Sequence, residues 1–333
     1  MLSLDHTKRS EFVSCPRKFY NRYVRNLQGQ NGSAALRYGI GWHGAMEGFY
    51  TEIAHKGWGA HATGIAKGAE VAQQHWVKES TKYNFNDEDY RNLPNLMKAF
   101  VKYLETFHFD EGMMQILEPE KTFRILMTPT KFELEKFPGL EPFYFTGRMD
   151  LEVSLNGRPW ILEFKTTSRP LAMQASTLHR SPQVMGYNYA AKATSLLKEI
   201  PDGSLVVLHQ ISAYKSRTTQ KYGEPKFDFT RNPQIFSQED LANWRLSFVA
   251  DAYALQLATK HHCFPMRLHS CYTYGACTFV NICEQNRMEG EEIMQGIFVD
   301  QDPWDVTKDE SKLVTIEDGD VELWDGIQRR ISS

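Results

Sequence analysis

The sequence lacks an uncharged apolar run of about 18 residues, the length that a membrane-spanning helix needs. Its first residues, MLSLDHTKRSEF, also lack the apolar segment of a signal peptide, so we expect a soluble, cytoplasmic protein in a reducing compartment. A Gly-rich Gly-Lys-Ser/Thr phosphate-binding loop is absent, which argues against an ATP-driven motor. Repeats and low-complexity linkers are absent as well, and we expect one catalytic core with a helical insertion.

An overall positive charge is also missing, because 38 Lys and Arg residues are opposed by 41 Asp and Glu residues. Any binding of nucleic acid must therefore come from local fields. Basic residues are concentrated in residues 1–30 and 215–231, although a solvated face is the simpler explanation of each run taken alone. Residues 300–325 hold ten acidic residues and two lysines, which predicts an acidic tail of low order over 300–333.

Apolar periodicity predicts a first third made mostly of helices, followed by strands from about residue 121. Ser181 before Pro182 has the pattern of a helix start, with a capping hydroxyl and a proline in the first turn. Ser237 and Asp240 resemble a capping box that opens a helix through about Thr259. The other expected elements are helices over 8–26, 39–56, 60–80 and 92–109, and strands near 204–213 and 225–230.

Two apolar runs, 145–155 and 158–166, are joined by an Asn-Gly pair that is typical of a two-residue hairpin turn. In such a hairpin the numbers of paired residues add to 313, which places Asp150 opposite Glu163. Directly opposite residues share a face, and Lys165 joins them because side chains alternate along a strand. The other face is apolar and is expected to pack in the core, with Met149, Leu151, Val153 and Leu155 against Trp160, Leu162 and Phe164.

This pair of carboxylates favours a metal site. Two ionised carboxylates held so close repel each other unless a cation lies between them. Their hard oxygen ligands suit Mg²⁺ or Mn²⁺, and Lys165 supplies a positive charge that can orient or deprotonate a water. A surface hairpin with a cross-strand Glu and Lys explains the same residues without a metal, so the spacing alone leaves both interpretations open.

The five cysteines form an odd set, which argues against a disulfide framework in an intracellular chain. Cys271, Cys277 and Cys283 are separated by five residues each, and Cys15 lies near the other end of the sequence. Four thiolates can hold either a tetrahedral Zn²⁺ or a [4Fe-4S] cluster, although the tight Cys-x-x-Cys of a zinc knuckle is absent. Cys263 is then a spare thiol, which we expect to be buried.

Asp150 and Glu163-Phe164-Lys165 resemble the pattern of the PD-(D/E)XK nuclease superfamily, in which an Asp ends one strand and Glu-x-Lys lies on the next. The segment SPQVMGY resembles the Gln-x-x-x-Tyr motif of RecB-like nucleases. Its Gln183 and Tyr187 are four residues apart, which puts both on one helix face. There they could contact the phosphate backbone or the catalytic lysine.

The resemblance implies further metal-site residues. His43 in RYGIGWHGAMEGFY matches the histidine that completes the metal site of the family. Glu120 resembles an acidic residue that precedes the first strand of the sheet, although Glu118 is an equal candidate. One or two divalent ions would then be held by His43, Asp150, Glu163 and the carbonyl of Phe164, with Glu120 as a weaker ligand.

The segment SEFVSCPRKFY resembles the N-terminal signature of the iron-sulfur branch of RecB-like nucleases. This branch includes the AddB nuclease domain, CRISPR-associated iron-sulfur exonucleases and the exonuclease V group. One N-terminal and three C-terminal cysteines bind a [4Fe-4S] cluster there, which implies Cys15, Cys271, Cys277 and Cys283 as ligands. Some members separate the second and third cysteines by only two residues, where this sequence has five.

The implied fold is α/β, with a restriction-endonuclease-like core in which helices flank a mixed central sheet. A single nuclease domain would span residues 1–299, with the helical insertion at about 51–115. The iron-sulfur segments, around residue 15 and over 271–283, would join the two ends of this domain. Such a cluster closes a long loop, so we expect it to stabilise the fold.

The implied function is a metal-dependent DNA exonuclease that acts on single-stranded DNA, in DNA repair, recombination or phage- or CRISPR-type DNA processing. Helices of the first third would frame the path of the DNA with Arg17, Lys18, Tyr20 and Arg22. A helicase or recombination protein is an expected partner, with the enzyme associated with the nucleoid. The alternatives are a non-catalytic or partner-dependent DNA-binding subunit, stabilised by the iron-sulfur cluster or by zinc.

Overall fold

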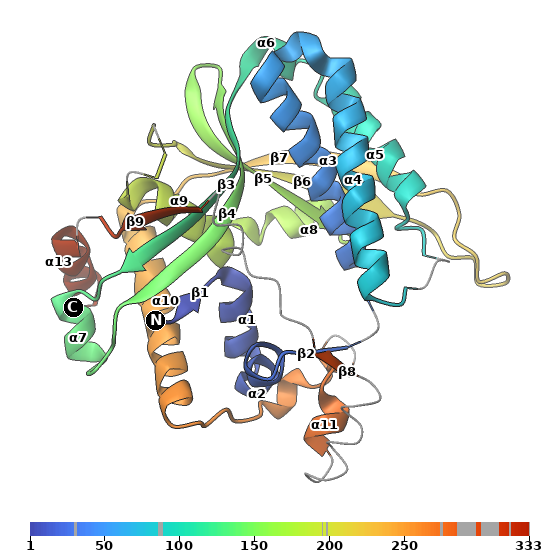
Figure 1. The fold of residues 1–333 in the computed structure, drawn as a ribbon. Coiled ribbons are helices and arrows are strands. Elements are labelled where there is room, and N and C mark those ends of the chain that lie inside the picture. Colours follow the sequence, from blue (N-terminus) through green and yellow to red (C-terminus); the bar gives the residue numbers. More distant parts are fainter. Residues whose placement is uncertain are drawn as a thin grey trace.

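The computed structural model describes residues 1–29, 32–85, 89–194, 196–197, 199–273, 276–284, 298–300, 313–319 and 321–332. These residues form a mixed seven-stranded sheet with helices on both faces (Figure 1). Its strands are β1 (Ser3–Leu4), β3 (Met114–Met127), β4 (Phe143–Leu155), β5 (Arg158–Thr167), β6 (Gly203–Ser212), β7 (Lys226–Gln234) and β9 (Leu313–Glu317). The order is β7-β6-β5-β4-β3-β9, and β1 pairs with β4. The expected class of fold, a mixed sheet flanked by helices, is confirmed.

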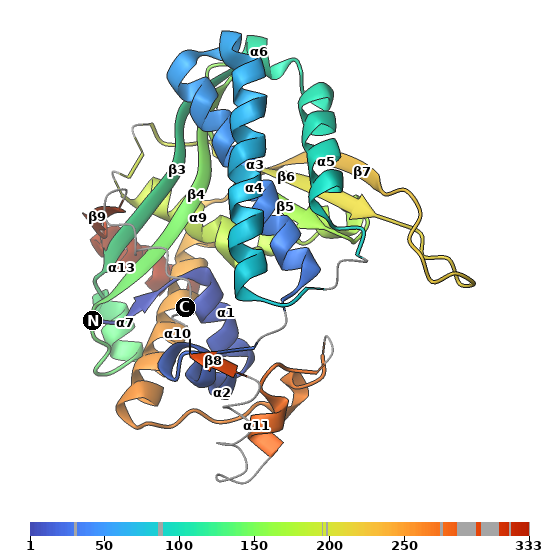
Figure 2. The same ribbon diagram turned by 45° about the vertical axis from the view of Figure 1, so that its right-hand side comes forward.

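Helices of the first third cover one face of the sheet (Figure 2). They are α3 (Ala34–Lys56), α4 (His61–Lys82) and α5 (Leu93–Thr106), and the short α6 (Asp110–Met113) leads from them into β3. Ser33 caps α3 by accepting a hydrogen bond from the backbone N–H of Leu36 at 3.4 Å. Gly48 and Gly68 let α3 and α4 approach closely, because a Cβ at either position would lie 2.6 Å from a backbone oxygen of the other helix.

The other face is covered by α1 (His6–Ser14), α9 (Pro182–Ala193), α10 (Gln238–Lys260) and α13 (Val321–Ser332), while α8 (Leu171–Ala175) contacts β6 and β7. Both expected capping patterns are confirmed. Ser181 accepts a hydrogen bond from the backbone of α9, and Ser237 and Asp240 form the capping box of α10. Local side-chain chemistry therefore fixes where these two helices begin.

The β4–β5 hairpin has the register that the sequence predicts. Asn156 and Gly157 have φ values of 52° and 75°, as the two-residue turn requires. From this turn the regular pairing continues back to Leu151 and Leu162, and paired numbers add to 313 throughout. The next pair in this register is Asp150 and Glu163, where the two strands separate.

This separation leaves an open edge on β4. On the side of β5, the first strand β1 pairs with β4 only near its start, and β5 pairs with it only from Leu151 onward. Strand β3 occupies the other edge along the whole length of β4. Residues 146–150 thus lie in a fork between β1 and β5. Met149 packs in a different hydrophobic cluster from Leu151, so its expected place on the same core face is wrong, because alternation is not maintained across the fork.

Two other boundaries differ from the sequence expectations. Strand β3 begins at Met114, earlier than the expected start near residue 121. The helix expected over 8–26 is interrupted at Cys15, which is extended (φ −163°, ψ 108°). Pro16 explains this break, since a proline disfavours helical geometry in the residue before it. The chain resumes as α2 (Pro16–Phe19) and a π-helix over Tyr20–Val24.

The described part of the C-terminal segment is ordered into the fold. Strand β9 pairs in parallel with β3, and α13 packs against α10 with Trp324 and Ile327 buried. The expectation of a low-order tail is therefore wrong for 313–319 and 321–332, because their apolar side chains occupy core positions. No helix of the described residues is long and apolar enough to cross a membrane.

Candidate active site

The residues predicted to form the catalytic centre meet at the fork between β1 and β5. Two strands supply the acidic and basic groups, α3 supplies the histidine, and α9 approaches from the other helical layer. The six side chains are His43 on α3, Asp150 on β4, Glu163 and Lys165 on β5, and Gln183 and Tyr187 on α9. Their spatial grouping follows from the fold, and their chemical roles remain predictions.

Asp150 is held between α3 and β5. One carboxylate oxygen, Oδ2, accepts a hydrogen bond from the backbone N–H of Phe164 at 2.8 Å. The other, Oδ1, lies 3.2 Å from Nδ1 of His43. Because the strands separate here, the carboxylate occupies the place that a backbone pair would otherwise fill, and it is fixed in position although it is buried.

Lys165 links Glu163 to the helix α9. Its Nζ donates to Oε1 of Glu163 at 2.6 Å and to Oε1 of Gln183 at 2.7 Å. The amide of Gln183 donates to Oε1 of Glu163 at 3.1 Å and to the hydroxyl of Tyr187 at 3.0 Å. Gln183 and Tyr187 therefore share a helix face, as their spacing predicts, and orient the lysine and the glutamate.

Burial and charge give the two carboxylates different acidities. Burial, together with the nearby charge of Asp150, raises the pKa of Glu163 to about 7. Burial acts in the same direction on Asp150, but the imidazole of His43 and the ammonium of Lys165 outweigh it and lower the pKa of Asp150. The pair therefore takes up its second negative charge only near neutral pH, with Asp150 ionised first.

The same site has an acceptor with no partner. Oε2 of Glu163 is buried and accepts no hydrogen bond from any described residue. A divalent cation fits this orphaned oxygen and would neutralise the repulsion from Asp150. His43, whose Nδ1 lies 3.2 Å from Oδ1 of Asp150, would be a second ligand of the same ion. Among the described side chains, no three His, Cys, Asp or Glu residues are already close enough to hold an ion.

Glu120 lies on β3, across β4 from the side of β5, and this is not where the sequence predicts it. It is inside β3 rather than before it, in a left-handed conformation with φ 54°. Its carboxylate is buried and lies 2.9 Å from Nε of Arg148. Burial raises its pKa well above the usual range, and Arg148 only partly opposes this effect. Glu118 instead pairs with Lys121 at 2.8 Å.

Two residues near the centre were not expected from the sequence. His6 begins α1 beside the fork, and burial together with the charge of Lys165 lowers its pKa to about 4. Glu47 is one turn after His43 on α3, and its charge acts on both Glu120 and Arg148. The four-residue spacing of His43 and Glu47 could have revealed the second of these.

The two segments that carry the predicted cluster cysteines meet, although no three of these side chains are close enough in the described residues to hold a single metal ion. The hydroxyl of Ser270 donates to the carbonyl of Ser14 at 2.7 Å, which joins the segment before Cys271 to the segment before Cys15. The backbone N–H of Arg267 also donates to Sγ of Cys15 at 3.4 Å. Burial and then the charges of Cys277 and Cys15 raise the pKa of Cys271, and the same causes act on Cys283, which lies on α11 (Val280–Glu284).

One further sequence expectation concerns this region. Cys263 is exposed, so the expectation that it is buried is wrong; it follows the end of α10 in a loop that packs Phe264 instead. The segment is completed by β2 (Leu27–Gly29), which pairs antiparallel with β8 (Phe298–Asp300).

The predicted DNA-binding residues lie on α2 and the following π-helix. Lys18 is 3.4 Å from Glu11, and Arg22 also pairs with Glu11. Arg17 lies over the ring of Tyr20, 5.7 Å from its centroid. One carboxylate therefore offsets part of the positive charge, and contact with DNA at this surface remains a prediction.

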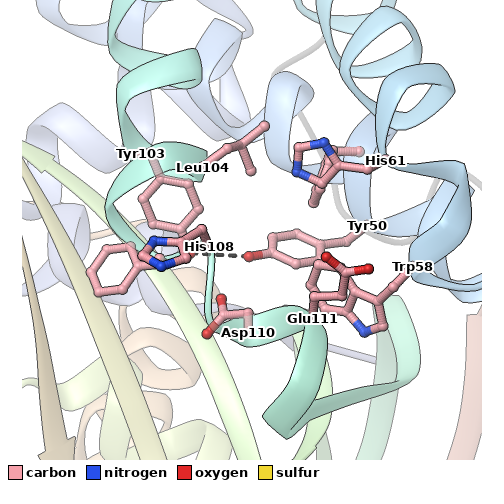
Figure 3. A pocket seen from close by; sticks show the side chains of 10 residues that line it. Tyr50, Trp58, His61, Tyr103, Leu104, His108, Asp110 and Glu111 are labelled. Atoms are coloured by element: carbon pink, nitrogen blue, oxygen red, sulfur yellow. Dashed lines mark hydrogen bonds between the residues drawn. The ribbon is translucent and has the colours of Figure 1, made fainter.

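A second group of titratable residues lines a small cavity between α3, α5 and α6 (Figure 3). His61, His108, Asp110 and Glu111 surround it, and the hydroxyls of Tyr50 and Tyr103 are 3.0 Å apart at its wall. Its volume is about 10 Å³, which accommodates about one water molecule. The cavity is too small for a substrate, and we regard it as structural.

One comparison with known proteins identifies the family of the chain. A family model described as the PD-(D/E)XK nuclease superfamily matches residues 3–284, and the chain belongs to this superfamily. Membership implies a nuclease with DNA as its substrate, and such nucleases typically use Mg²⁺ or Mn²⁺. No curated protein matches the chain. A solved structure, described as the crystal structure of SSO0001, is 12% identical, with 77% of this chain and 87% of that chain covered and a TM-score of 0.23.

Proposed function

We propose that the protein is a metal-dependent DNA exonuclease that degrades single-stranded DNA in repair, recombination or phage- or CRISPR-type DNA processing. The observation that carries this proposal is the buried Asp150–Glu163 pair, with the orphaned Oε2 of Glu163 and an adjacent lysine. A carboxylate pair that repels itself in the resting protein is a poor structural element and a good cation site. We also propose that the enzyme acts with a helicase or recombination protein and associates with the nucleoid.

Each residue of the centre has a proposed role. Asp150, Glu163, His43 and the carbonyl of Phe164 would hold Mg²⁺ or Mn²⁺, which supplies charge stabilisation at the scissile phosphate. The ammonium of Lys165 would orient the attacking water, and its neutral amine form could accept a proton from that water. Gln183 and Tyr187 keep Lys165 in place through the hydrogen bonds described above and would contact the phosphate backbone.

The proposal is tested with end-labelled linear and covalently circular single-stranded DNA, incubated with protein purified without oxygen, with Mg²⁺, Mn²⁺ or chelator. We expect metal-dependent degradation of the linear DNA alone. Asp150→Asn should abolish it, since the amide cannot replace the anionic ligand. Glu105→Gln, a change to an exposed glutamate of α5, is the matched control and should retain activity.

Other outcomes are informative. Cutting of circles that is abolished by Asp150→Asn would make the protein an endonuclease that uses the same centre. Binding of DNA without cleavage of either form, by protein that is folded and loaded with metal, would favour the partner-dependent binding subunit. Cleavage that persists in Asp150→Asn would contradict the assignment of the centre.

We further propose that Cys15, Cys271, Cys277 and Cys283 hold a [4Fe-4S] cluster, with Zn²⁺ as the alternative. The thiols of Cys15 and Cys277 contribute to the raised pKa of Cys271 and Cys283, which supports their proximity, and a four-iron cluster holds its thiolates farther apart than a single ion does. Cys15→Ser should remove the visible absorbance of the cluster and lower the melting temperature. Iron and zinc analysis of the same preparation separates the two metals, and full retention of iron and sulfide in Cys15→Ser would contradict the ligand set.

A further inference from the structure

A basic hairpin projects from the sheet between β6 and β7, visible as the thin yellow loop at the right of Figure 1. It comprises residues 213–225, with the sequence AYKSRTTQKYGEP. Lys215 pairs with Tyr222, and the backbone N–H groups of Gly223 and Ser216 donate at 2.9 Å to the carbonyls of Tyr214 and Lys221. The segment is therefore a self-supporting hairpin rather than a loosely held loop.

The two faces of this hairpin differ. On one face, the ring of Tyr222 lies 4.9 Å from the ring of Tyr90, centroid to centroid, and Nζ of Lys215 lies over the Tyr222 ring at 5.3 Å. The ion pair between Glu224 and Lys98 at 3.7 Å ties the base of the hairpin to α5. This face holds the hairpin against the body of the protein.

The opposite face carries an exposed aromatic ring. Consecutive residues of a strand point to opposite sides, so Tyr214 faces away from the pair formed by Lys215 and Tyr222. Its partner across the hairpin is Gly223, which has no side chain to cover the ring. Tyr214 is 73% exposed as a result. An aromatic ring left uncovered on a rigid support is a stacking surface.

Cationic side chains accompany this ring. Lys221 lies on the same face of the hairpin as Tyr214, and Arg217 is at the tip; both are exposed. A flat ring with neighbouring cations matches single-stranded nucleic acid, whose bases stack and whose phosphates are negative. A hydrophobic protein partner would favour a wider apolar patch without this charge.

The hairpin also extends from the catalytic end of the sheet. Strand β6 runs parallel to β5, and Leu208 is the residue paired with Lys165. Tyr214 follows Leu208 by six residues, a distance of up to about 20 Å along an extended strand. A single strand with its scissile phosphate at Lys165 could thus reach the ring a few nucleotides away.

We propose that Tyr214, with Arg217 and Lys221, is a binding site for single-stranded DNA, stacking one base and holding its phosphates a few nucleotides from the catalytic centre. This inference rests on the proposed nuclease function and names a further part of its substrate site. It predicts that affinity depends on the hairpin only when the DNA is long enough to reach it.

The test measures the Kd of fluorescently labelled oligothymidine by anisotropy, in Asp150→Asn protein so that the DNA stays intact. On a long oligonucleotide, Tyr214→Leu should weaken binding by about 5- to 150-fold, the range expected for loss of one stacked base. Tyr214→Trp keeps an aromatic ring and should retain the affinity. On a trinucleotide all three proteins should bind alike, since this ligand cannot span the distance.

The charge of the hairpin is tested separately. Lys221→Ala should reduce the slope of log Kd against log salt by about 0.7, as expected for one lost phosphate contact on a single strand. Lys131→Ala on α7 (Lys131–Lys136), at the other side of the molecule in Figure 1, is the matched control and should leave the slope unchanged.

Three results would overturn the inference. Equal affinity of Tyr214→Leu and its parent for long DNA would exclude stacking and leave the hairpin surface to a protein partner. Equal loss on long and short DNA would show that Tyr214 acts through the catalytic centre instead. A parent protein that binds no single-stranded DNA at all would remove the proposed function, and the hairpin site with it.

Discussion

Glu163→Gln offers a direct test of strain at the proposed catalytic centre, because glutamine resembles the protonated form of glutamate. In the metal-free protein the pKa of Glu163 is raised from 4.5 to about 7. The folded state therefore binds this proton more tightly than the unfolded state does. Stability must then fall as pH rises from 4.5 to about 7, and the whole loss is present above pH 7.

The size of this loss follows from the pKa difference, which corresponds to about 3 kcal/mol for a buried, coupled carboxylate. Wild type and Glu163→Gln should each be unfolded with urea at pH 5 and at pH 8, in chelator, and followed by tryptophan fluorescence. From pH 5 to pH 8, the free energy of unfolding of the wild type should fall by about 2–3 kcal/mol relative to that of Glu163→Gln. A difference between two pH values cancels the constant effect of the substitution itself.

Two additions make this test specific. Saturating Mg²⁺ should stabilise the wild type more than Glu163→Gln at pH 8, because an ion that binds only the folded state shifts its stability by mass action. Glu105→Gln, on the exposed face of α5, should follow the wild type at both pH values. Parallel pH profiles for wild type and Glu163→Gln would refute the view that Glu163 is a strained carboxylate awaiting a cation.

Three further predictions concern the framework of the site. Arg245→Ala should lower the free energy of unfolding, measured by urea titration, by about 3–5 kcal/mol, because it leaves the buried carboxylates of Glu133 and Asp318 without their cation. A loss below 1 kcal/mol would contradict this. Burial lowers the pKa of His209 from 6.5 to about 3, so the folded protein binds this proton less tightly than the unfolded chain does. The free energy of unfolding of the wild type should therefore fall below pH 6.5, by about 2 kcal/mol at pH 5. His209→Gln should lack this pH dependence in the same titration. Gly147→Ala would place a Cβ 2.6 Å from the buried ring of Phe123 and 3.0 Å from the ring of Tyr187. The free energy of unfolding should therefore fall by about 1–3 kcal/mol in the same titration, and nuclease assays should show a lower kcat because Tyr187 is displaced. An unchanged kcat would argue against a positioning role of Tyr187.

Much of the spatial grouping of the candidate residues could be predicted because the features that set it are local in the sequence. The Asn-Gly turn fixes the register of the β4–β5 hairpin, and this register alone sets Asp150 beside Glu163. The four-residue spacing of Gln183 and Tyr187 is equally local, and the proline after Ser181 marks where their helix begins. Such features depend on a few neighbouring residues and not on the rest of the fold.

The parts that could not be predicted depend on distant contacts. Strand β1 has only two residues, and nothing in Ser3–Leu4 reveals that it pairs with β4. The place of β9 beside β3 is equally remote in sequence, and the acidic residues around it conceal a short apolar strand. Cys263 has no local feature that determines its exposure, which depends on how the loop after α10 packs.

The N-terminal segment connects the fork that holds Asp150 and Glu163 with the cysteine region. Strand β1 pairs with β4 at one end of the fork. His6 follows this strand, and the charge of Lys165 contributes to the lowered pKa of its imidazole. Cys15 closes the same segment against the loop that contains Arg267, through a hydrogen bond to its thiol. The short α1 is thus held at both ends, by the sheet beside Asp150 and Glu163 and by the cysteine region. Whatever fixes Cys15 therefore also fixes a wall of the fork, and the proposed cluster would stabilise the proposed catalytic centre in this way.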